Sequence, residues 1–453
     1  MSNINVATMG AKSNNRKIAV IFFLQYAVWG AYLTSLGSLV GNAGLGNYIW
    51  AFYMVPCIAA VLFPPLFGAI ADKWIEPKKL LSISHFASSA LLLAAGIFIM
   101  RHLHRVPAWP LFLMYAAGMS FYMPTLALSD SVAMDILESE GKDTVSDLPK
   151  LRVFGTVGFI VAMVVVDLLH WGHQPYQLML SAVLGFVLAL YARALPSVKK
   201  IVSEKAEKVN LFKDLKNVFS HGNLAAFLIF SVFLGAALQI TNGYANPYFM
   251  SFRSDATTAS SIIARYPGCV LVLSQISEAL CILLIPFFMK RFGIRKVIII
   301  SMVAWIIRFA LLGLGSPTGW GASLFVVSCL VYGVAFDFFN ISGSLYIRTM
   351  TPTGHEATYQ GVFKLATNGL GALAGTAGAG IVTNSMLHST RVNDQILLVG
   401  NTPDSWAKVW YIFALYMLVV LVANIICYRE NVGTIHGSDT TGYEKNRKGF
   451  DEN

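Results

Sequence analysis

Single charged residues inside long apolar segments constrain this sequence most. Glu278 lies within CVLVLSQISEALCILLIPFF, Asp337 lies within CLVYGVAFDFFNISGS, and Arg152 begins LRVFGTVGFIVAMVVV. Each segment is otherwise apolar enough to cross a bilayer. An ionised group in hydrocarbon is so costly that it persists mainly where it faces a polar cavity, a partner or a proton path. The pattern therefore indicates a protein that moves a solute across a membrane rather than an inert anchor.

The apolar segments are numerous enough to fill the chain. Charged residues make up 12% of the sequence, against about 25% in an average soluble protein. About twelve segments have the roughly 20 apolar residues that a transmembrane helix needs. They lie near 18–40, 47–72, 80–100, 108–134, 151–170, 176–196, 222–250, 262–289, 297–315, 320–347, 359–387 and 406–428. We therefore expect an all-α membrane protein with twelve transmembrane helices.

Lysine and arginine residues fall mostly in alternate loops. They precede the first segment, follow the second and eighth, and crowd the stretch 197–221 between the sixth and seventh. Loops rich in these residues stay on the cytoplasmic side, so both termini are predicted to be cytoplasmic. The net charge of +10 belongs to these loops and gives no indication of nucleic-acid binding.

The stretch 197–221 also divides the segments six and six. The expected organisation is a cytoplasmic N-terminus (1–17), an N-terminal six-helix half (18–196), a cytoplasmic linker (197–221), a C-terminal six-helix half (222–428) and a cytoplasmic tail (429–453). Weak echoes support two related halves, such as YAAGMSF in the first and YGVAF in the second. Paired repeats with a site at their interface are common in secondary transporters. Alternatively, apolar helices resemble one another by composition alone.

Polar and aromatic residues recur at helical spacing within several segments. Arg152, Thr156 and Phe159 follow the i, i+4, i+7 pattern of one helix face. Gln239 and Asn242 are spaced i, i+3, as are Gln275 and Glu278. Tyr332, Phe336 and Asn340 step by four along another face, with Asp337 beside them. Amides can bind sugar hydroxyls and base edges, and aromatic planes can stack on a ring. The set favours a substrate with a polyhydroxylated ring and a flat heterocycle.

The loop after the second segment carries a further pattern. Gly68-x-x-x-Asp72-Lys73, followed by Pro77-Lys78-Lys79, resembles the loop signature of the major facilitator superfamily. The glycine would allow close helix approach, and Asp72 with the lysines would form a charge latch that breaks as the halves rock. We expect Gly68, Asp72 and Lys73 to form this gating loop.

Several longer motifs resemble the bacterial nucleoside:proton symporter family within that superfamily. The resemblance extends over about residues 17–428 and is carried by FLQYAVWGAYLTSLGS, MPTLALSD, RVFGTVGFI, GAALQITN, SQISEAL and AFDFFNISGS. It implies uptake of a nucleoside with protons by alternating access across the bacterial cytoplasmic (inner) membrane. It also implies that Glu278 and Asp337 couple proton movement. The implied nucleoside pocket between the halves comprises Arg152, Thr156, Phe159, Gln239, Asn242, Gln275, Glu278, Tyr332 and Phe336.

The chain departs from the family pattern at four places. Ala237 stands where a glutamate often precedes LQITN, Asp130 where an amide is usual, and Phe154 where a tryptophan follows the arginine. The last outer loop, at about 388–405, is longer. These differences bear on substrate preference, and Asp130 could pair or compete with Arg152. Purine and pyrimidine nucleosides are not distinguished by these residues.

Structural roles compete with several of these assignments. Asp337 could pair with Arg308 and lock two helices together, and Arg152 could extend to water at a helix end. Trp29, Tyr32 and Gln25 are more often packing residues than ligands. Gly369, Gly371, Gly375 and Gly378 are typical of close helix packing.

Other functions remain open at this stage. The same scaffold could carry a sugar, a glycoside or a nucleobase, or it could sense a ligand without transporting it. An enzyme ranks last, because the sequence holds no metal cluster, phosphate loop or nucleophile–base arrangement. We expect a monomeric carrier whose partners are nucleoside, protons and lipid, without nucleic acid or cofactor.

Overall fold

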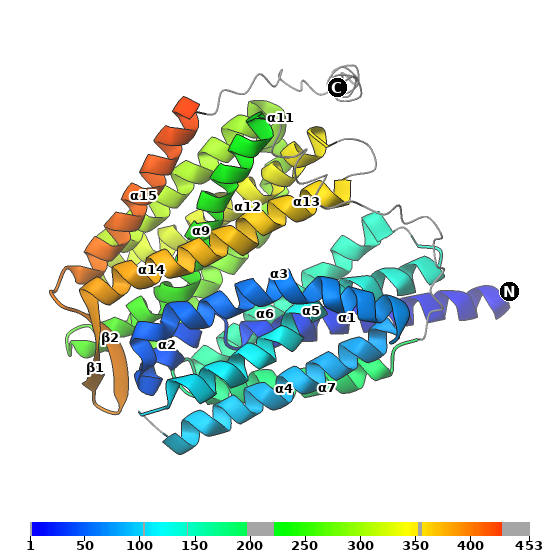
Figure 1. Ribbon diagram of the computed structural model, residues 1–453, viewed down its shortest axis with the longest axis horizontal. Helices are drawn as coiled ribbons and strands as arrows, with labels where there is room; N and C mark the ends of the chain where they lie inside the picture. The colour runs from blue at the N-terminus through cyan, green and yellow to red at the C-terminus, as the bar shows by residue number, and fades with distance from the viewer. Residues whose placement is uncertain (1, 103–104, 143, 197–221, 352–355, 428–453) are drawn as a thin grey trace.

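The computed structural model describes residues 2–102, 105–142, 144–196, 222–351 and 356–427. The predicted linker and tail lie outside the described residues. Two groups of helices pack side by side (Figure 1). The first helix group comprises α1 (Ser2–Gly30), α2 (Leu36–Val40), the short π-helix η1 (Gly41–Leu45), the 3-10 helix η2 (Gly46–Tyr48), α3 (Ile49–Lys73), α4 (Pro77–His102), α5 (Ala108–Ser139), α6 (Thr144–Leu168) and α7 (Tyr176–Arg193).

The second helix group follows the stretch 197–221. It comprises α9 (Gly222–Ser251), the 3-10 helix η3 (Phe252–Ser254), α10 (Ile262–Arg265), α11 (Pro267–Leu314), α12 (Trp320–Thr349), α13 (Glu356–Lys364), the π-helix η4 (Leu365–Gly371), α14 (Ala372–Met386), the strands β1 (Leu387–Val392) and β2 (Gln395–Gly400), and α15 (Ser405–Cys427).

Ten helical segments in the described part of the chain are long and apolar enough to cross a membrane. One of them, α11, has 48 residues, and a straight helix of that length would measure about 72 Å, more than twice the thickness of a bilayer core. Gly293 interrupts it with φ 77° and ψ 166°, a conformation that glycine adopts at little steric cost. The element is therefore two helical rods joined at Gly293.

The strands β1 and β2 depart from the all-α prediction. They form an antiparallel hairpin in which Val392 pairs with Gln395, leaving Asn393 and Asp394 as a two-residue turn. Asn393 has φ 53°, and asparagine tolerates this left-handed region better than most residues. The longer loop predicted at about 388–405 is thus an ordered hairpin. We call the side of the molecule that carries it the hairpin end.

The two helix groups are joined at the hairpin end. In Figure 1 the ribbons lie close together near β1 and β2 and diverge toward the end marked N. Four hydrogen bonds between side chains or backbone of the two groups lie toward the hairpin end. They run from Ser38 Oγ to Asn246 Oδ1 (2.6 Å), from Ile396 N to Asn42 Oδ1 (2.8 Å), from Asn384 Nδ2 to Asn47 O (3.0 Å) and from Cys269 N to Asp167 Oδ2 (2.8 Å).

Close packing of α1 on α6 positions the first part of the site. A Cβ atom at Gly158 would clash with the backbone of Phe23, and one at Gly30 would clash with the backbone of Phe159. Only glycine lets the two backbones approach this closely. The glycines of RVFGTVGFI therefore hold α6 against α1, so that Arg152 and Phe159 lie beside the aromatic residues Tyr26 and Trp29.

Candidate functional site

Arg152 forms a hydrogen-bonded ion pair on the inner face of the first helix group. Its Nη1 atom lies 3.2 Å from Asp130 Oδ2, and its Nη2 atom donates to the hydroxyl of Tyr26 at 3.0 Å. Asp130 therefore pairs with Arg152, which was one of its two expected behaviours. The arginine side chain keeps 51% of its surface exposed, so donors remain for a ligand even though the charge is balanced.

Aromatic rings continue this face toward the hairpin end. Trp29 contacts Phe159 edge to face at 6.4 Å between ring centroids and lies 6.5 Å from Tyr26. Thr156 lies between Arg152 and Phe159 on α6 and is half-buried. The three residues predicted on α6 thus share a face with aromatic rings of α1, which offer planes for a flat ring.

Tyr32 and Gln25 point into the first helix group. The Tyr32 hydroxyl donates to Met119 Sδ, and Gln25 Nε2 donates to Thr125 Oγ1 at 2.8 Å. Both side chains are fully buried. The structure therefore supports the packing role that was expected for them.

The second helix group contributes two carboxyls and two stacked rings. Tyr332 and Phe336 stack on α12 with centroids 5.7 Å apart and planes 10° from parallel. Glu278, on α11, interacts electrostatically with both Asp337 and Tyr332. Glu278 is half-buried and Asp337 is buried. The two predicted coupling residues are therefore close enough for the protonation of one to be felt by the other.

Arg308 does not pair with Asp337, so the suggested helix lock is absent. Arg308 Nη1 donates to the backbone oxygen of Ser328 at 2.8 Å, and its guanidinium lies 4.6 Å from the centroid of the Tyr332 ring. Asp337 is more than a helical turn further along α12. Among the described residues, Asp337 Oδ2 is buried without a hydrogen-bond partner.

Three predicted amides remain available for a ligand. Gln239 and Asn242 lie on α9 and Gln275 lies on α11, and all three are half-buried. Within the described part of the chain their side chains make no hydrogen bond to the protein. Amides that are neither bonded nor fully solvated suit the hydroxyls and base edges of a polar ligand.

Electrostatic contacts connect the two faces. Tyr26 in the first helix group interacts with Glu278 in the second. Asp130 likewise interacts with Lys364 at the end of α13. The sequence analysis missed Tyr26 and Lys364 as site residues. Two features of the sequence could have indicated them: Tyr26 and Trp29 are spaced i, i+3, and Lys364 is a lysine inside the eleventh apolar segment.

The structure describes only part of the predicted gating loop at the end of α3. A Cβ atom at Gly68 would meet no atom within 4 Å, so the predicted close helix approach is absent from this structure. Lys73 is exposed, and the side chain of Asp72 is outside the described set. Nearby, Glu76 forms ion pairs with Lys78 and Lys79 at 3.8 and 3.3 Å.

The later glycines follow their predicted packing role in part. A Cβ atom at Gly371 would lie 2.5 Å from Val232 O, and one at Gly375 would clash with the backbone of Ala236. A Cβ atom at Gly378 would meet nothing within 4 Å. Gly371 and Gly375 therefore hold η4 and α14 against α9, whereas Gly378 does not make such a contact.

Comparison with known proteins gives consistent matches along the chain. The model of the family described as nucleoside H+ symporter matches residues 12–433. The chain is 37% identical over 433 residues to the nucleoside permease NupG of Escherichia coli (strain K12), covering 94% of this chain and 99% of the relative. It is also 37% identical over 421 residues to the xanthosine permease of the same organism, covering 92% and 96%.

Solved structures agree with the sequence matches. The crystal structure of the nucleoside transporter NupG aligns with a TM-score of 0.82 at 37% identity, covering 92% of this chain and 100% of that one. A bacterial homologue of the lysosomal transporter Spinster, in an inward-facing conformation, aligns with a TM-score of 0.63 at 12% identity, covering 97% and 98%, and shows the fold alone. These neighbours are transporters of the major facilitator type. On this evidence the chain belongs to the nucleoside H+ symporter family.

Proposed function

We propose an alternating-access mechanism for this proton-coupled nucleoside transporter of the bacterial inner membrane. The moving parts are two six-helix halves, 18–196 and 222–428, and the rods of α11 on either side of Gly293 are two of the twelve transmembrane helices. α1, which is not among the ten candidate spans, is another. The carrier works as a monomer and needs no cofactor beyond the coupling proton.

The proposed orientation places both termini in the cytoplasm. It is supported by the lysines and arginines of the loop at 73–79, the stretch 197–221 and the segment 290–296, because such loops remain on the cytoplasmic side. The hairpin end then faces outward. In this orientation the four hydrogen bonds at the hairpin end hold the outer side together, and the nucleoside would leave toward the cytoplasm.

The nucleoside lies between the two faces described above. The single observation that supports this placement is the electrostatic interaction between Tyr26 in one helix group and Glu278 in the other. Arg152, Thr156 and Phe159 bind from the first half. The ligands from the second half are Gln239, Asn242, Gln275, Glu278, Tyr332 and Phe336, with the stacked rings of Tyr332 and Phe336 accommodating the base.

Glu278 and Asp337 provide the coupling. A proton on this pair changes the charge that faces the nucleoside and Tyr26, so it shifts the relative energies of the outward-open and inward-open states. A membrane potential supplies about 2.3 kcal/mol per charge per 100 mV. One proton per nucleoside would therefore support accumulation of about fiftyfold, at about 1.4 kcal/mol per factor of ten.

Reconstitution tests this proposal. Purified protein in proteoliposomes should accumulate labelled uridine only when a pH gradient or a potential is imposed, and a protonophore should abolish the accumulation. Unlabelled nucleosides should compete, whereas sugars, glycosides and nucleobases should not. Binding of uridine without accumulation would instead indicate a sensor. Competition by a sugar would show that the substrate class is sugars rather than nucleosides.

A further inference from the structure

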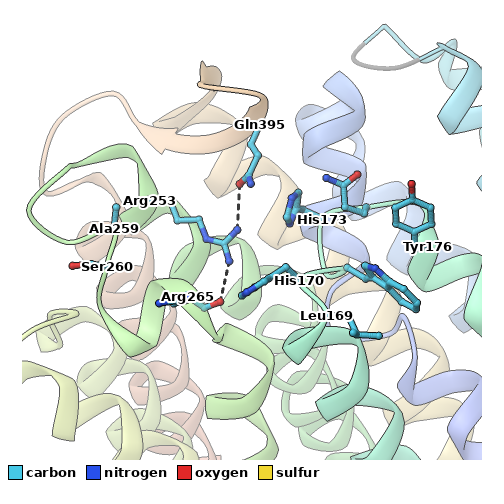
Figure 2. Close-up of a pocket in the computed structure, with 11 residues that line it drawn as sticks. Leu169, His170, His173, Tyr176, Arg253, Ala259, Ser260, Arg265 and Gln395 are labelled. Atoms are coloured by element: carbon cyan, nitrogen blue, oxygen red, sulfur yellow. Dashed lines mark hydrogen bonds between the residues drawn. The ribbon is translucent and has the colours of Figure 1, made fainter.

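A pocket with several basic and polar side chains lies at the hairpin end, away from the proposed nucleoside site. Its volume is about 870 Å³. Its walls come from the loop between α6 and α7, from the segment around η3 and α10, and from the hairpin (Figure 2). The residues that matter here are His170, His173, Gln174, Arg253, Arg265 and Gln395. We call this the outer pocket, and it is complete only when the two helix groups meet at the hairpin end.

Arg253 is a fixed cation at the centre of the outer pocket. Its Nε, Nη1 and Nη2 atoms donate to Ala264 O at 2.7 Å, Gln395 Oε1 at 3.2 Å and Arg265 O at 3.2 Å. All three acceptors are neutral, and a guanidinium has five N–H donors. Two donors and the positive charge therefore remain for a ligand. Figure 2 shows the guanidinium between the hairpin and the two histidines.

Further basic groups surround it. The Arg265 guanidinium makes no hydrogen bond or ion pair within the described part of the chain and lies 5.5 Å from the Tyr266 centroid. His170 stacks on the same ring at 5.3 Å and has φ 56°, a strained backbone of the kind that collects at functional sites. His173 is 5% exposed. Among the described residues that line the pocket none is acidic.

One carboxylate lies nearby but does not neutralise the pocket. Asp167 interacts electrostatically with Arg253, yet its Oδ2 atom accepts a hydrogen bond from the backbone nitrogen of Cys269 at 2.8 Å. Among the described ion pairs none joins Asp167 to Arg253 within 4 Å. The residues that line the pocket therefore carry a net positive charge, from Arg253 and Arg265, and suit an anion.

The size and the rings identify the class of anion. A volume of this size is in the range that small-molecule pockets occupy, and it is far larger than inorganic phosphate requires. Guanidinium groups match phosphate oxygens geometrically, and the rings of Trp171, His170 and Tyr176 line the same space. We infer that the outer pocket binds a phosphate monoester that bears a flat ring, namely a nucleoside 5′-monophosphate.

The consequence for transport rests on the proposed function. Because both helix groups contribute to the outer pocket, a bound nucleotide stabilises the arrangement in which the hairpin end is closed. A nucleotide on the outside then lowers the fraction of carriers open to the outside. The phosphorylated form of the cargo is thereby an inhibitor of uptake rather than a substrate.

Binding to the full-length purified protein tests the inference. Calorimetry with 5′-UMP should show binding that is weakened about tenfold by Arg265→Gln, since a lost charge-assisted hydrogen bond is worth about that factor. His170→Asn, which tolerates positive φ, should weaken it as well. Arg105→Gln, an exposed arginine at the same end but outside the pocket, is the matched control and should leave UMP binding unchanged. Uridine should still bind all three variants.

Competition experiments identify the source of the anion. Inorganic phosphate should compete weakly with UMP, and vesicles rich in phosphatidylglycerol should not displace it. Displacement by those vesicles would assign the pocket to lipid headgroups and overturn the inference. So would undiminished UMP binding in Arg265→Gln, or stoichiometric competition between UMP and uridine for one site. A failure of uridine to bind, with UMP binding intact, would instead overturn the proposed function alone.

Discussion

His173 makes the hairpin end sensitive to acid. The imidazole is 5% exposed, and burial, together with electrostatic interactions with Arg253 and His170, lowers the pKa of His173 to about 4 from the ordinary 6.5. Above pH 6.5 the ring is neutral whether buried or exposed, so it does not affect stability. Below pH 6.5 an exposed ring takes up a proton that the buried ring refuses. The closed structure therefore loses stability as the pH falls toward 4.

The size of the effect follows from the shift. Each pH unit between the two pKa values costs the closed structure about 1.4 kcal/mol. Between pH 6.5 and pH 5 the loss is about 2 kcal/mol, and it levels off at about 3 kcal/mol below pH 4. His173→Gln removes the titrating ring. It leaves the backbone oxygen of residue 173, which accepts a hydrogen bond from Asn42 Nδ2 at 2.8 Å.

The assay compares unfolding of the two proteins. The free energy of unfolding in detergent should fall by about 2 kcal/mol more for the natural protein than for His173→Gln between pH 7.5 and pH 5. Carboxyl groups titrate in both proteins and cancel in the difference. His102→Gln, at an exposed histidine of the same end, should leave the natural pH curve unchanged. Parallel curves for the natural protein and His173→Gln would refute the reasoning.

Three further outcomes test the proposed site and its scaffold. Glu278→Gln should abolish proton-driven accumulation of uridine in proteoliposomes while uridine binding persists; retained accumulation would remove Glu278 from coupling. The double change Gln239→Ala and Asn242→Ala should weaken uridine affinity by about ten- to hundredfold, since two neutral hydrogen bonds are worth about 1 kcal/mol each and more when buried. Unchanged affinity in calorimetry would show that uridine does not bind at these two amides. Gly158→Ala should lower the melting temperature measurably, because its Cβ atom would clash with the backbone of Phe23, and a melting temperature equal to that of the natural protein would show that α1 and α6 can separate freely.

Helical periodicity predicted much of the site. The face of Arg152, Thr156 and Phe159 needed only the 3.6-residue repeat, and the structure places the three together against α1. Partners between helices were harder to predict. Asp130 lies 22 positions from Arg152, so their pairing depends on how α5 packs against α6, and the sequence allowed either pairing or competition.

The errors have similar physical origins. Arg308 and Asp337 lie on neighbouring helices, but their relative heights in the membrane depend on the connection at 315–319 between α11 and α12, and the structure places Arg308 beside Ser328 and Tyr332. The hairpin was predicted only as a longer loop, although an Asn-Asp turn between two β-prone runs could have indicated it. Gly68 matched a sequence signature, whereas helix contacts there depend on which state the carrier occupies.

The hydrogen bonds at the hairpin end also affect how permeable the membrane is to protons when the carrier has no substrate. In the proposed orientation they shut the periplasmic entrance with groups from loops and helix ends, without help from any cargo. In that orientation, contacts of this kind oppose the entry of protons through an idle copy, and so help to preserve the proton gradient across the membrane. The free energy needed to break those contacts is required only at the start of each import cycle, before a molecule can enter.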